Sequence, residues 1–448
     1  MANENTMKEI IALLKHRGFV YPSSEIYGGF GASYDYGPLG CEMINNIKQL
    51  WKQDIIREHS QVVETDGAII LNPKTWEASG HLGSGFADSL VECRQCHHRF
   101  KTEEVVKSIC PDCGGQTTEP RDYNLMMKTF IGPVEDTHNQ AYLRPETCQS
   151  IFLDFRLVLD SMRMKLPFGI AQIGKSFRNE INPKNFLYRQ REFEQMEMEW
   201  FTPADEADKW FEYWKERRWN WYLSLGMKKE NLRFREVPKE ELAHYAKRAV
   251  DVDYHFPFGW HEIEGIHNRG DFDLRNHSEH SGRDLSYKNT DQSESYYPHV
   301  IETSAGVGRL MLAFICDAYH KIEGGRDSES KREEEIILQL SPKLAPIQVA
   351  VFPLMKKPEL ISLAQNVFQN LSGSLRCQYD ETGSIGKRYR RQDEIGTPLA
   401  VTIDFDSLTQ NDVTIRDRVS MKQVRVKYDS LVEEIKRMLL GGFKNNEN

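Results

Sequence analysis

Two strand-like segments between Phe168 and Trp200 constrain the fold of this chain more than any other feature. They flank Asn182-Pro183-Lys184-Asn185, a run that favours a turn because proline fixes φ and asparagine tolerates left-handed backbone. Two strands joined through a single turn pair in antiparallel fashion. We therefore expect a long antiparallel hairpin at this point of the chain.

The predicted hairpin has one polar face and one mostly apolar face, because side chains alternate along a strand. In the first segment this alternation puts Arg178 and Glu180 on the same face. In the second segment Met196, Met198 and Trp200 share one face. The opposite face carries Arg191, Phe193, Gln195, Glu197 and Glu199.

The residue types on the polar face suit a nucleotide. A guanidinium can hold a phosphate through two hydrogen bonds, an aromatic ring can stack on a base, and carboxylates can hold magnesium or an ammonium group. For any single Arg-x-Glu, a salt-bridged solvent face is the commoner explanation. The functional interpretation depends on combining the hairpin with distant segments.

One such segment is residues 302–309, which joins a strand to a helix. Glu302 and Ser304 are two residues apart, so both side chains can reach one pocket. Gly306 and Gly308 let another group approach the backbone closely. Arg309, at the start of the helix, is placed unfavourably with the helix dipole unless an anion lies there. The segment indicates phosphate binding, and a packed turn with a surface arginine is the alternative.

Four cysteines occur as two Cys-x-x-Cys pairs within residues 88–122, a region where turn residues cluster and both periodicities fade. This spacing is typical of a structural zinc site, in which four thiolates close a tetrahedron and leave no open position for catalysis. Free thiols or a redox pair are the alternative. The predicted zinc ligands are Cys93, Cys96, Cys110 and Cys113.

A chain of 448 residues suits two or three domains. Residues 321–335 are dense in charge and read as a solvated connection, so we place a boundary near Ser341. We expect a first domain over residues 1–340, with residues 88–122 inserted in it, and a second over 341–448. In the second domain, strand-like and helix-like segments alternate at 347–352, 359–371 and 399–405, as in a small α/β domain.

The remaining expected elements follow from caps and periodicity. A helix over residues 6–17 begins with a capping box, and a long amphipathic helix follows Pro38. A third helix spans 310–319. We expect further strands at 61–71, 256–266 and 300–302.

Net charge is −9, so any contact with RNA must use local basic patches against an acidic field. One candidate patch is the cluster Lys387, Arg388, Arg390 and Arg391, although a solvated charge run is the usual explanation for such a cluster taken alone. The apolar runs are too short for a membrane span, and the first residues carry charges where a signal peptide needs an apolar stretch. We expect a cytoplasmic protein with neither a membrane nor DNA as partner.

Three separated motifs carry a resemblance to a known family. Pro38 ahead of a long helix, Phe177-Arg178-x-Glu180 with a downstream Arg191-x-Phe193, and Gly306-x-Gly308-Arg309 opening a helix resemble, in order, the signature motifs of class II aminoacyl-tRNA synthetases. The resemblance narrows to the homodimeric glycyl-tRNA synthetases. It does so at residues 143–147 (LRPET), 189–197 (RQREFEQME) and 386–389 (GKRY).

The resemblance implies the fold. It implies an α+β catalytic domain, with an antiparallel sheet flanked by helices, and an inserted zinc-ribbon-like module. It also implies a C-terminal α/β anticodon-binding domain, and it puts Pro38 and its helix at a dimer interface.

The resemblance also implies the site residues. Arg178 and Arg309 are the implied catalytic residues, with Glu262 and Glu302 as candidates for magnesium or ribose contacts. The implied ATP contacts are Arg178, Asn179, Glu180, Tyr188, Arg191, Phe193, Glu262, Ile263, Glu302, Gly306, Gly308 and Arg309. The implied glycine contacts are Glu146, Arg178, Phe193, Gln195, Glu197, Glu302, Ser304 and Gly306.

The implied reaction is activation of glycine with ATP and transfer of the glycyl group to the 3′ end of tRNA(Gly). It needs no protein nucleophile, because positioning and charge stabilisation by arginines and Mg²⁺ supply the catalysis. Two alternatives remain. One is a catalytically inactive, synthetase-like nucleic-acid-binding subunit, and the other is activation of a different small amino acid such as serine or alanine.

Overall fold

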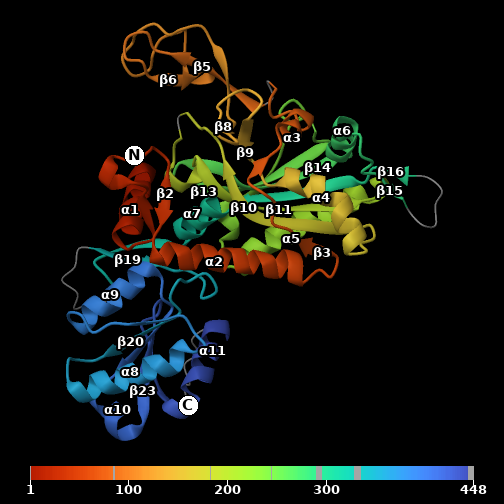
Figure 1. Ribbon diagram of the computed structural model, residues 1–448. Coiled ribbons are helices and arrows are strands. Elements are labelled where there is room, and N and C mark those ends of the chain that lie inside the picture. Colours follow the sequence, from red (N-terminus) through yellow and green to blue (C-terminus); the bar gives the residue numbers. More distant parts are fainter. Residues whose placement is uncertain are drawn as a thin grey trace.

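The computed structural model describes residues 2–83, 86–181, 183–243, 245–288, 295–326 and 334–441. A large central body carries a small module at one end and a C-terminal domain at the other, seen in orange and blue in Figure 1. No helix in these ranges has the length and apolar content that crossing a bilayer requires.

The central body is built on a seven-stranded sheet. Its strand order is β12 (Leu232–Glu236), β13 (Arg248–Phe256), β14 (Gly259–Gly270), β17 (His299–Gly306), β11 (Glu192–Thr202), β10 (Phe168–Phe177) and β3 (Val62–Glu64). Every neighbouring pair is antiparallel except β10 and β3. The antiparallel sheet flanked by helices is confirmed.

The predicted hairpin is β10 paired with β11, but its turn is wider than expected. β10 ends at Phe177 and β11 begins at Glu192, so the four-residue turn was wrong. A fourteen-residue connection, containing the short 3₁₀ helix Phe186–Tyr188, replaces it, and Asn182 falls outside the described residues. Arg178 and Glu180 therefore follow the strand and do not alternate along it.

The two faces of the hairpin differ as predicted. Met196, Met198 and Trp200 are fully buried on one face, in a core with α1 (Ala2–His16), α2 (Pro38–Lys52), α5 (Ala207–Ser224) and α7 (Val307–Ala318). Trp200 meets Trp214 of α5 at 5.4 Å between ring centroids. Each such apolar side chain contributes about 1.5–3 kcal/mol by leaving water. This core fixes the strands, and so fixes the polar side chains on the opposite face.

A second apolar cluster covers one end of that opposite face. α4 (Cys148–Ser161) packs Phe155 against Phe201 at 4.6 Å, and α6 (Phe272–Ser281) adds Leu274. The rest of the face carries the polar side chains of β11 and β17.

The expected strand over residues 61–71 was wrong, because the segment splits between two sheets. β3 joins the central sheet, whereas β4 (Ile70–Leu71) pairs with β9 (Gln140–Leu143), which also pairs with β8 (Met127–Phe130). Between them the chain bends at Gly67, whose N–H donates to Gln172 Oε1 at 2.7 Å. The remaining elements of the body are β1 (Val20–Pro22), β2 (Tyr34–Tyr36), the π-helical turn Gln53–Arg57, α3 (Pro73–Ala78), β15 (Tyr287–Lys288) and β16 (Ser295–Tyr296).

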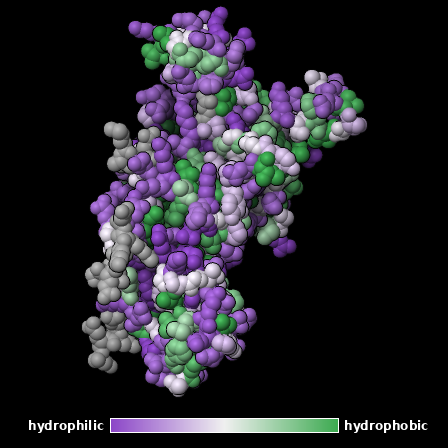
Figure 2. Space-filling model, turned by 90° about the vertical axis from the view of Figure 1, so that its left-hand side faces the viewer, coloured by the Kyte–Doolittle hydropathy of each residue, from purple (hydrophilic) through white to green (hydrophobic). Residues whose placement is uncertain are grey.

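The inserted module is a three-stranded sheet of β5 (Ala87–Glu92), β6 (Arg99–Lys101) and β7 (Arg121–Asn124). It stands off the body in Figure 1, and Figure 2 shows a largely hydrophilic surface around it. The expected module over 88–122 thus has a defined sheet at its base.

The charged segment before the C-terminal domain is more ordered than expected. β18 (Tyr319–Glu323) and β19 (Glu334–Leu338) form an antiparallel pair on either side of residues 327–333, which lie outside the described ranges. Where we predicted only a solvated connection, strand pairing satisfies the backbone.

The C-terminal domain has the predicted α/β character. Its sheet runs β21 (Cys377–Tyr379), β20 (Val349–Pro353), β22 (Leu399–Ile403), β23 (Asp412–Asp417) and β24 (Gln423–Lys427). Its helices are α8 (Pro358–Ser372), α9 (Ile385–Ile395), α10 (Phe405–Gln410) and α11 (Leu431–Gly441).

The basic cluster on α9 is mostly engaged within this domain. Arg388 is buried and donates to the carbonyls of Pro353 and Gly383. Arg390 pairs with Glu394 at 2.7 Å, and Arg391 pairs with Asp380. Lys387 stays exposed. The patch available to RNA is therefore smaller than four clustered cations suggest.

Candidate active site

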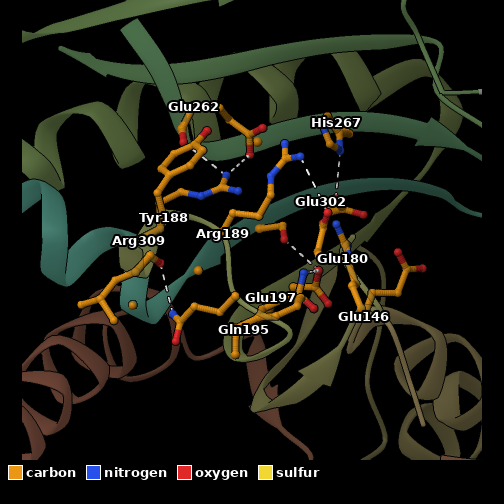
Figure 3. A pocket seen from close by; sticks show the side chains of 18 of the residues that line it. Glu146, Glu180, Tyr188, Arg189, Gln195, Glu197, Glu262, His267, Glu302 and Arg309 are labelled. Carbon is orange, nitrogen blue, oxygen red and sulfur yellow. Dashed lines mark hydrogen bonds and ion pairs between the residues drawn. The ribbon is translucent and has the colours of Figure 1, made fainter. Parts of the chain in front are cut away.

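A cavity of about 260 Å³ lies over the polar face of β11 and β17 and gathers most of the predicted site residues. Figure 3 shows Glu146 and Glu302 on one side of it, with Tyr188, Glu262 and Arg309 on the other. The predicted residues that line it are Glu146, Arg178, Glu180, Tyr188, Phe193, Gln195, Glu197, Glu262, Glu302, Ser304, Gly306, Gly308 and Arg309.

Three predicted ATP contacts do not line this cavity. Asn179 and Arg191 line a second, larger cleft of about 1530 Å³ between the module and the body. Ile263 is fully buried in the apolar core. Ile263 lies at a register shift of β14, where Asp253 pairs with Glu262 but Val252 pairs with Glu264. A β-bulge of this kind turns neighbouring side chains to new faces.

Hydrogen bonds lock the acidic end of the cavity around Glu197. Its Oε1 accepts from Ser304 Oγ at 2.7 Å and from Gln195 Nε2 at 3.0 Å. Its Oε2 accepts from the Thr147 N–H at 2.9 Å and from the Thr147 hydroxyl. Ser304 reaches Glu197 because the two residues are register partners on β17 and β11. Glu197 therefore has a fixed orientation.

Burial and nearby charges set the ionisation of Glu197. Burial, together with the neighbouring Glu302 and Glu146 carboxylates, raises the pKa of Glu197 to about 7. Burial also disfavours ionisation of Glu146 and Glu302, but adjacent cations prevail. His81 and Arg269 bring the pKa of Glu146 well below its usual range, and Arg269 and His267 lower the pKa of Glu302. Of these three carboxyl groups, Glu146 and Glu302 are thus ionised, and Glu197 has a pKa near neutral pH.

Glu199 lies beneath this group and differs from it. It is the register partner of Glu302, and both are within the same close cluster as Cys148. Its two carboxylate oxygens are buried and make no hydrogen bond within the described residues. Burial and the Glu302 charge raise the pKa of Glu199 well above its usual range. A neutral, protonated Glu199 follows, since an unpaired buried carboxylate is strongly disfavoured.

Arg178 supplies a cation beside two aromatic rings. Its guanidinium carbon is 5.5 Å from the Phe193 ring centroid and 5.6 Å from the Phe86 ring centroid. Its Nε donates to the Pro145 carbonyl at 3.0 Å. The terminal nitrogens make no hydrogen bond to any residue that the structure describes, so they face the cavity with donors to offer.

Arg309 supplies the second cation, from the first turn of α7. Its Nη1 donates to Glu262 Oε1 at 3.0 Å, and the guanidinium lies 4.4 Å from the Tyr188 ring centroid. The start of α7 is tightly packed, because a Cβ on Gly308 would lie 2.5 Å from the Tyr36 hydroxyl and 2.5 Å from Gln190 Nε2. The two arginines, distant in sequence, thus face one cavity.

Sequence reasoning missed Arg189, His267 and Tyr245, which also line the cavity. Arg189 lies 3.7 Å from Glu180, and His267 Nδ1 lies 2.9 Å from Glu302 Oε1. Arg269, just behind the cavity, pairs with both Glu302 and Asp273. Alternation along β14 from Gly265 would have pointed to His267 and Arg269.

The four cysteines of the module converge as the spacing predicted. All four sulfur atoms lie within 4.8 Å of one another. Cys93 Sγ is 3.4 Å from Cys113 Sγ, and Cys96 Sγ is 3.7 Å from Cys110 Sγ. Four sulfurs around zinc at about 2.3 Å stand roughly 3.8 Å apart, so the cluster fits a tetrahedral ion. His97 and His98 instead pair with Glu92 and Asp112 at the surface.

Replacing Cys110 with serine is expected to lower zinc from about one ion per chain to a small fraction of that, since three thiolates bind a structural ion less tightly. Elemental analysis after gel filtration measures this. Cys41→Ser, at an exposed thiol far from the cluster, is the matched control. Full zinc retention in the Cys110 variant would contradict the assignment.

Comparisons with known proteins agree with this geometry. Residues 130–318 match the family described as tRNA synthetase class II core domain (G, H, P, S and T), and residues 348–438 match the anticodon binding domain. A glycine–tRNA ligase of Treponema denticola is 49% identical over 96% of this chain and 96% of its own length. Those of Ruminiclostridium cellulolyticum and Streptomyces coelicolor are 50% and 48% identical, each over 96% of this chain and 98% of the relative.

Proposed function

The chain belongs to the glycine–tRNA ligase family of class II tRNA synthetases, and from this premise we propose that it activates glycine with ATP and transfers the glycyl group to tRNA(Gly). One observation carries the proposal: Arg178 and Arg309 line the same cavity as Glu146, Glu197 and Glu302. Two cations for a triphosphate thus stand beside carboxylates for an ammonium group.

We assign the nucleotide to the side of the cavity with the arginines and rings. Phe193 offers a stacking face, Glu180 a carboxylate for the adenine amino group, and Arg178 donors for the α-phosphate. Arg309 would leave Glu262 to reach the γ-phosphate. Asn179 and Arg191 stay proposed contacts only if the bound nucleotide extends toward the second cleft, and Ile263 would act only through the core.

Glycine has no side chain to recognise, so its ammonium group and its small size must carry specificity. Glu146, Glu197 and Glu302 converge where the ammonium would lie. Hydrogen bonds among Ser304, Gln195 and Glu197 leave little freedom to admit a larger residue. An added methyl group in such a filled site costs about 1–3 kcal/mol.

The chemistry proposed is in-line attack of the glycine carboxylate on the α-phosphate, with release of pyrophosphate. Arg178 would stabilise the charge that develops on the phosphate oxygens and orient the carboxylate. Bound Mg²⁺ would add charge neutralisation at the phosphates. Glu262 suits this ion better than Glu302, because Glu302 is already paired with Arg269 and His267 whereas Glu262 is partly exposed.

Glycine binding is expected to strengthen as pH rises from 6 to 8. The ammonium needs ionised Glu197, whose pKa of about 7 leaves it largely protonated at pH 6. The KM for glycine should fall by up to about tenfold per pH unit below pH 7 and then level off, because binding releases a proton. ATP–pyrophosphate exchange at saturating ATP measures it, with the KM for ATP as the control.

The raised pKa of Glu197 also predicts the direction in which pH changes the stability of the protein. A carboxyl whose pKa rises on folding contributes stability below its unfolded value of 4.5, and that contribution is lost as pH increases through about 7. Glycine should therefore protect against thermal unfolding more at pH 8 than at pH 6. A KM for glycine that rises with pH would contradict this account.

The proposal extends to tRNA and to compartment. We place the catalytic domain in residues 1–340 and the anticodon-binding domain in 341–448, supported by the family match to 348–438. All eight cysteines lie in the described ranges and none forms a disulfide, which favours a reducing compartment such as the cytoplasm.

We also propose a homodimer, on different grounds from those in the sequence. The apolar face of α2 packs within its own chain through Met43, Ile47 and Trp51, so it is not available to a partner. A loop just before it exposes Ile26 (87%), Tyr27 (87%) and Phe30 (80%), which favours burial against a second copy. Sedimentation that gives only monomer at micromolar concentration would refute the proposed homodimer.

Pyrophosphate exchange tests the proposed function directly. We expect exchange that depends on glycine, with serine and alanine about 10- to 200-fold poorer in kcat/KM. Exchange with serine or alanine in preference to glycine would show another amino acid as substrate. No exchange with any amino acid would favour the inactive nucleic-acid-binding alternative.

A further inference from the structure

The two ends of the inserted module are tied together where they join the body. Ala87 pairs with Asn124, and the Leu125 N–H donates to the Phe86 carbonyl at 3.2 Å. Asn124 Nδ2 also donates to the His81 carbonyl at 2.8 Å. We call His81, Phe86, Asn124 and Leu125 the module base. These contacts make the module base one unit with the sheet of the module.

His81 of the module base contacts the acidic end of the cavity. Its Nε2 lies 3.3 Å from Glu146 Oε2, and its Nδ1 lies 2.8 Å from Ser79 Oγ. The ring can donate to the Glu146 carboxylate from Nε2, while Nδ1 shares a hydrogen bond with the serine hydroxyl. The other Glu146 oxygen, Oε1, accepts from Cys148 and Gln149 at 3.0 Å each. His81 is thus the contact that orients Oε2.

The module base also contacts the cationic end, through Arg178. The guanidinium carbon lies 5.6 Å from the Phe86 ring centroid, about as close as it lies to the Phe193 ring centroid. The Leu125 carbonyl accepts from the N–H of Asn179, the next residue along, at 2.8 Å. Both the side chain of Arg178 and the backbone beside it are therefore held from the module base.

From this geometry we infer that His81 and Phe86 are positioning residues, and that the module sets the geometry of glycine activation before any tRNA binds. The inference rests on the proposed function, because it takes Glu146 as a glycine ligand and Arg178 as a phosphate ligand. A displacement of about 1 Å at such ligands is enough to slow a reaction by about 100-fold. The same four residues that close the module therefore hold one ligand of each substrate.

Four substitutions at His81 and Phe86 test this in ATP–pyrophosphate exchange without tRNA. His81→Ala is expected to raise the KM for glycine about tenfold and leave the KM for ATP unchanged, since a charge-assisted hydrogen bond is lost. His81→Gln should recover part of this, because its amide can donate to Glu146. Phe86→Ala is expected to lower kcat about tenfold with little change in the KM for glycine, and Phe86→Tyr should stay near wild type.

Asn124→Ala is expected to change the kinetic constants that the His81 and the Phe86 variants change. It loosens the module from His81 and leaves Glu146 and Arg178 themselves unchanged. We expect a three- to fivefold change in both the KM for glycine and kcat, because the Asn124 side chain donates to the His81 carbonyl and accepts from the Met126 N–H. Asp122→Asn, at an exposed residue on the same strand, is the matched control and should behave as wild type. Melting temperatures show that each variant is folded.

The outcomes separate the two claims. If wild type exchanges with glycine and His81→Ala, Phe86→Ala and Asn124→Ala all match it, the inference fails while the proposed function stands. Equal losses in every kinetic constant, with lowered melting temperature, would reduce His81 and Phe86 to structural roles and also overturn it. If wild type shows no glycine-dependent exchange, both claims fall. The split between the KM for glycine and kcat supports the inference.

Discussion

Arg178→Ala is expected to lower kcat/KM for glycine-dependent pyrophosphate exchange by about 100- to 1,000-fold, the cost of removing one preorganised donor to a developing charge. The loss should be large because the terminal nitrogens of Arg178 face the cavity and make no hydrogen bond to any other described residue. Its aromatic neighbours Phe86 and Phe193 hold the guanidinium in place, so no reorganisation is needed when the phosphate charge develops. Steady-state exchange across ATP and glycine concentrations measures the change.

Two companion variants interpret this result. Lys175→Ala removes a cation three residues earlier on β10, where it pairs with Glu192 at the surface, and should leave exchange within about twofold. Arg178→Lys keeps the charge but loses the planar fork, so its activity should fall between wild type and alanine. An Arg178→Ala enzyme with near-normal exchange would remove this residue from the proposed chemistry.

Arg218→Ala is expected to destabilise the central body by about 3–5 kcal/mol, because it leaves a buried charge without its partner. Arg218 is fully buried on α5 and donates to Glu264 Oε1 at 2.7 Å and to Asp54 Oδ2 at 2.5 Å. Glu264 is also fully buried on β14, where Tyr222 supplies its other hydrogen bond. Urea unfolding followed by tryptophan fluorescence measures the loss.

The neighbouring Arg217 offers a matched control. It pairs with Glu58 and Asp54 nearer the surface, so Arg217→Ala should cost no more than about 1 kcal/mol. Glu264→Gln in the Arg218→Ala background should restore part of the stability, because it removes the stranded charge. Equal destabilisation by the two single arginine variants would contradict a buried ion pair as the cause.

Local periodicity was enough to predict the polar and apolar faces of the hairpin. Met196, Met198 and Trp200 went to the core and Gln195 and Glu197 to the cavity, as strand alternation requires. The helices after Pro38, before Tyr319 and in the C-terminal domain were predictable for the same reason. A repeat of 2 or 3.6 residues is a local property, so the sequence alone contains it.

Other features had no local signal. Arg178 and Glu180 reach the cavity, yet they do so from a connection after β10 and not by strand alternation. Glu262 and His267 both line the cavity, although strict alternation along a strand would put residues an odd number of positions apart on opposite faces. The register shift at Ile263 allows both to face the cavity. The sequence of the cluster on α9 predicted a basic patch. In the structure Arg388 points inward, where it donates to carbonyls of other segments.

By itself the sequence determined which chemical groups this protein possesses, and the class of fold that presents them. Tertiary structure decided which of those groups are charged. Four glutamates, Glu146, Glu197, Glu199 and Glu302, are alike in sequence, yet Arg269 and the histidines ionise two of them, burial leaves Glu199 neutral, and Glu197 stands between. Ionisation depends on burial and on charges a few ångströms away, and some of those neighbours come from positions more than a hundred residues distant along the chain.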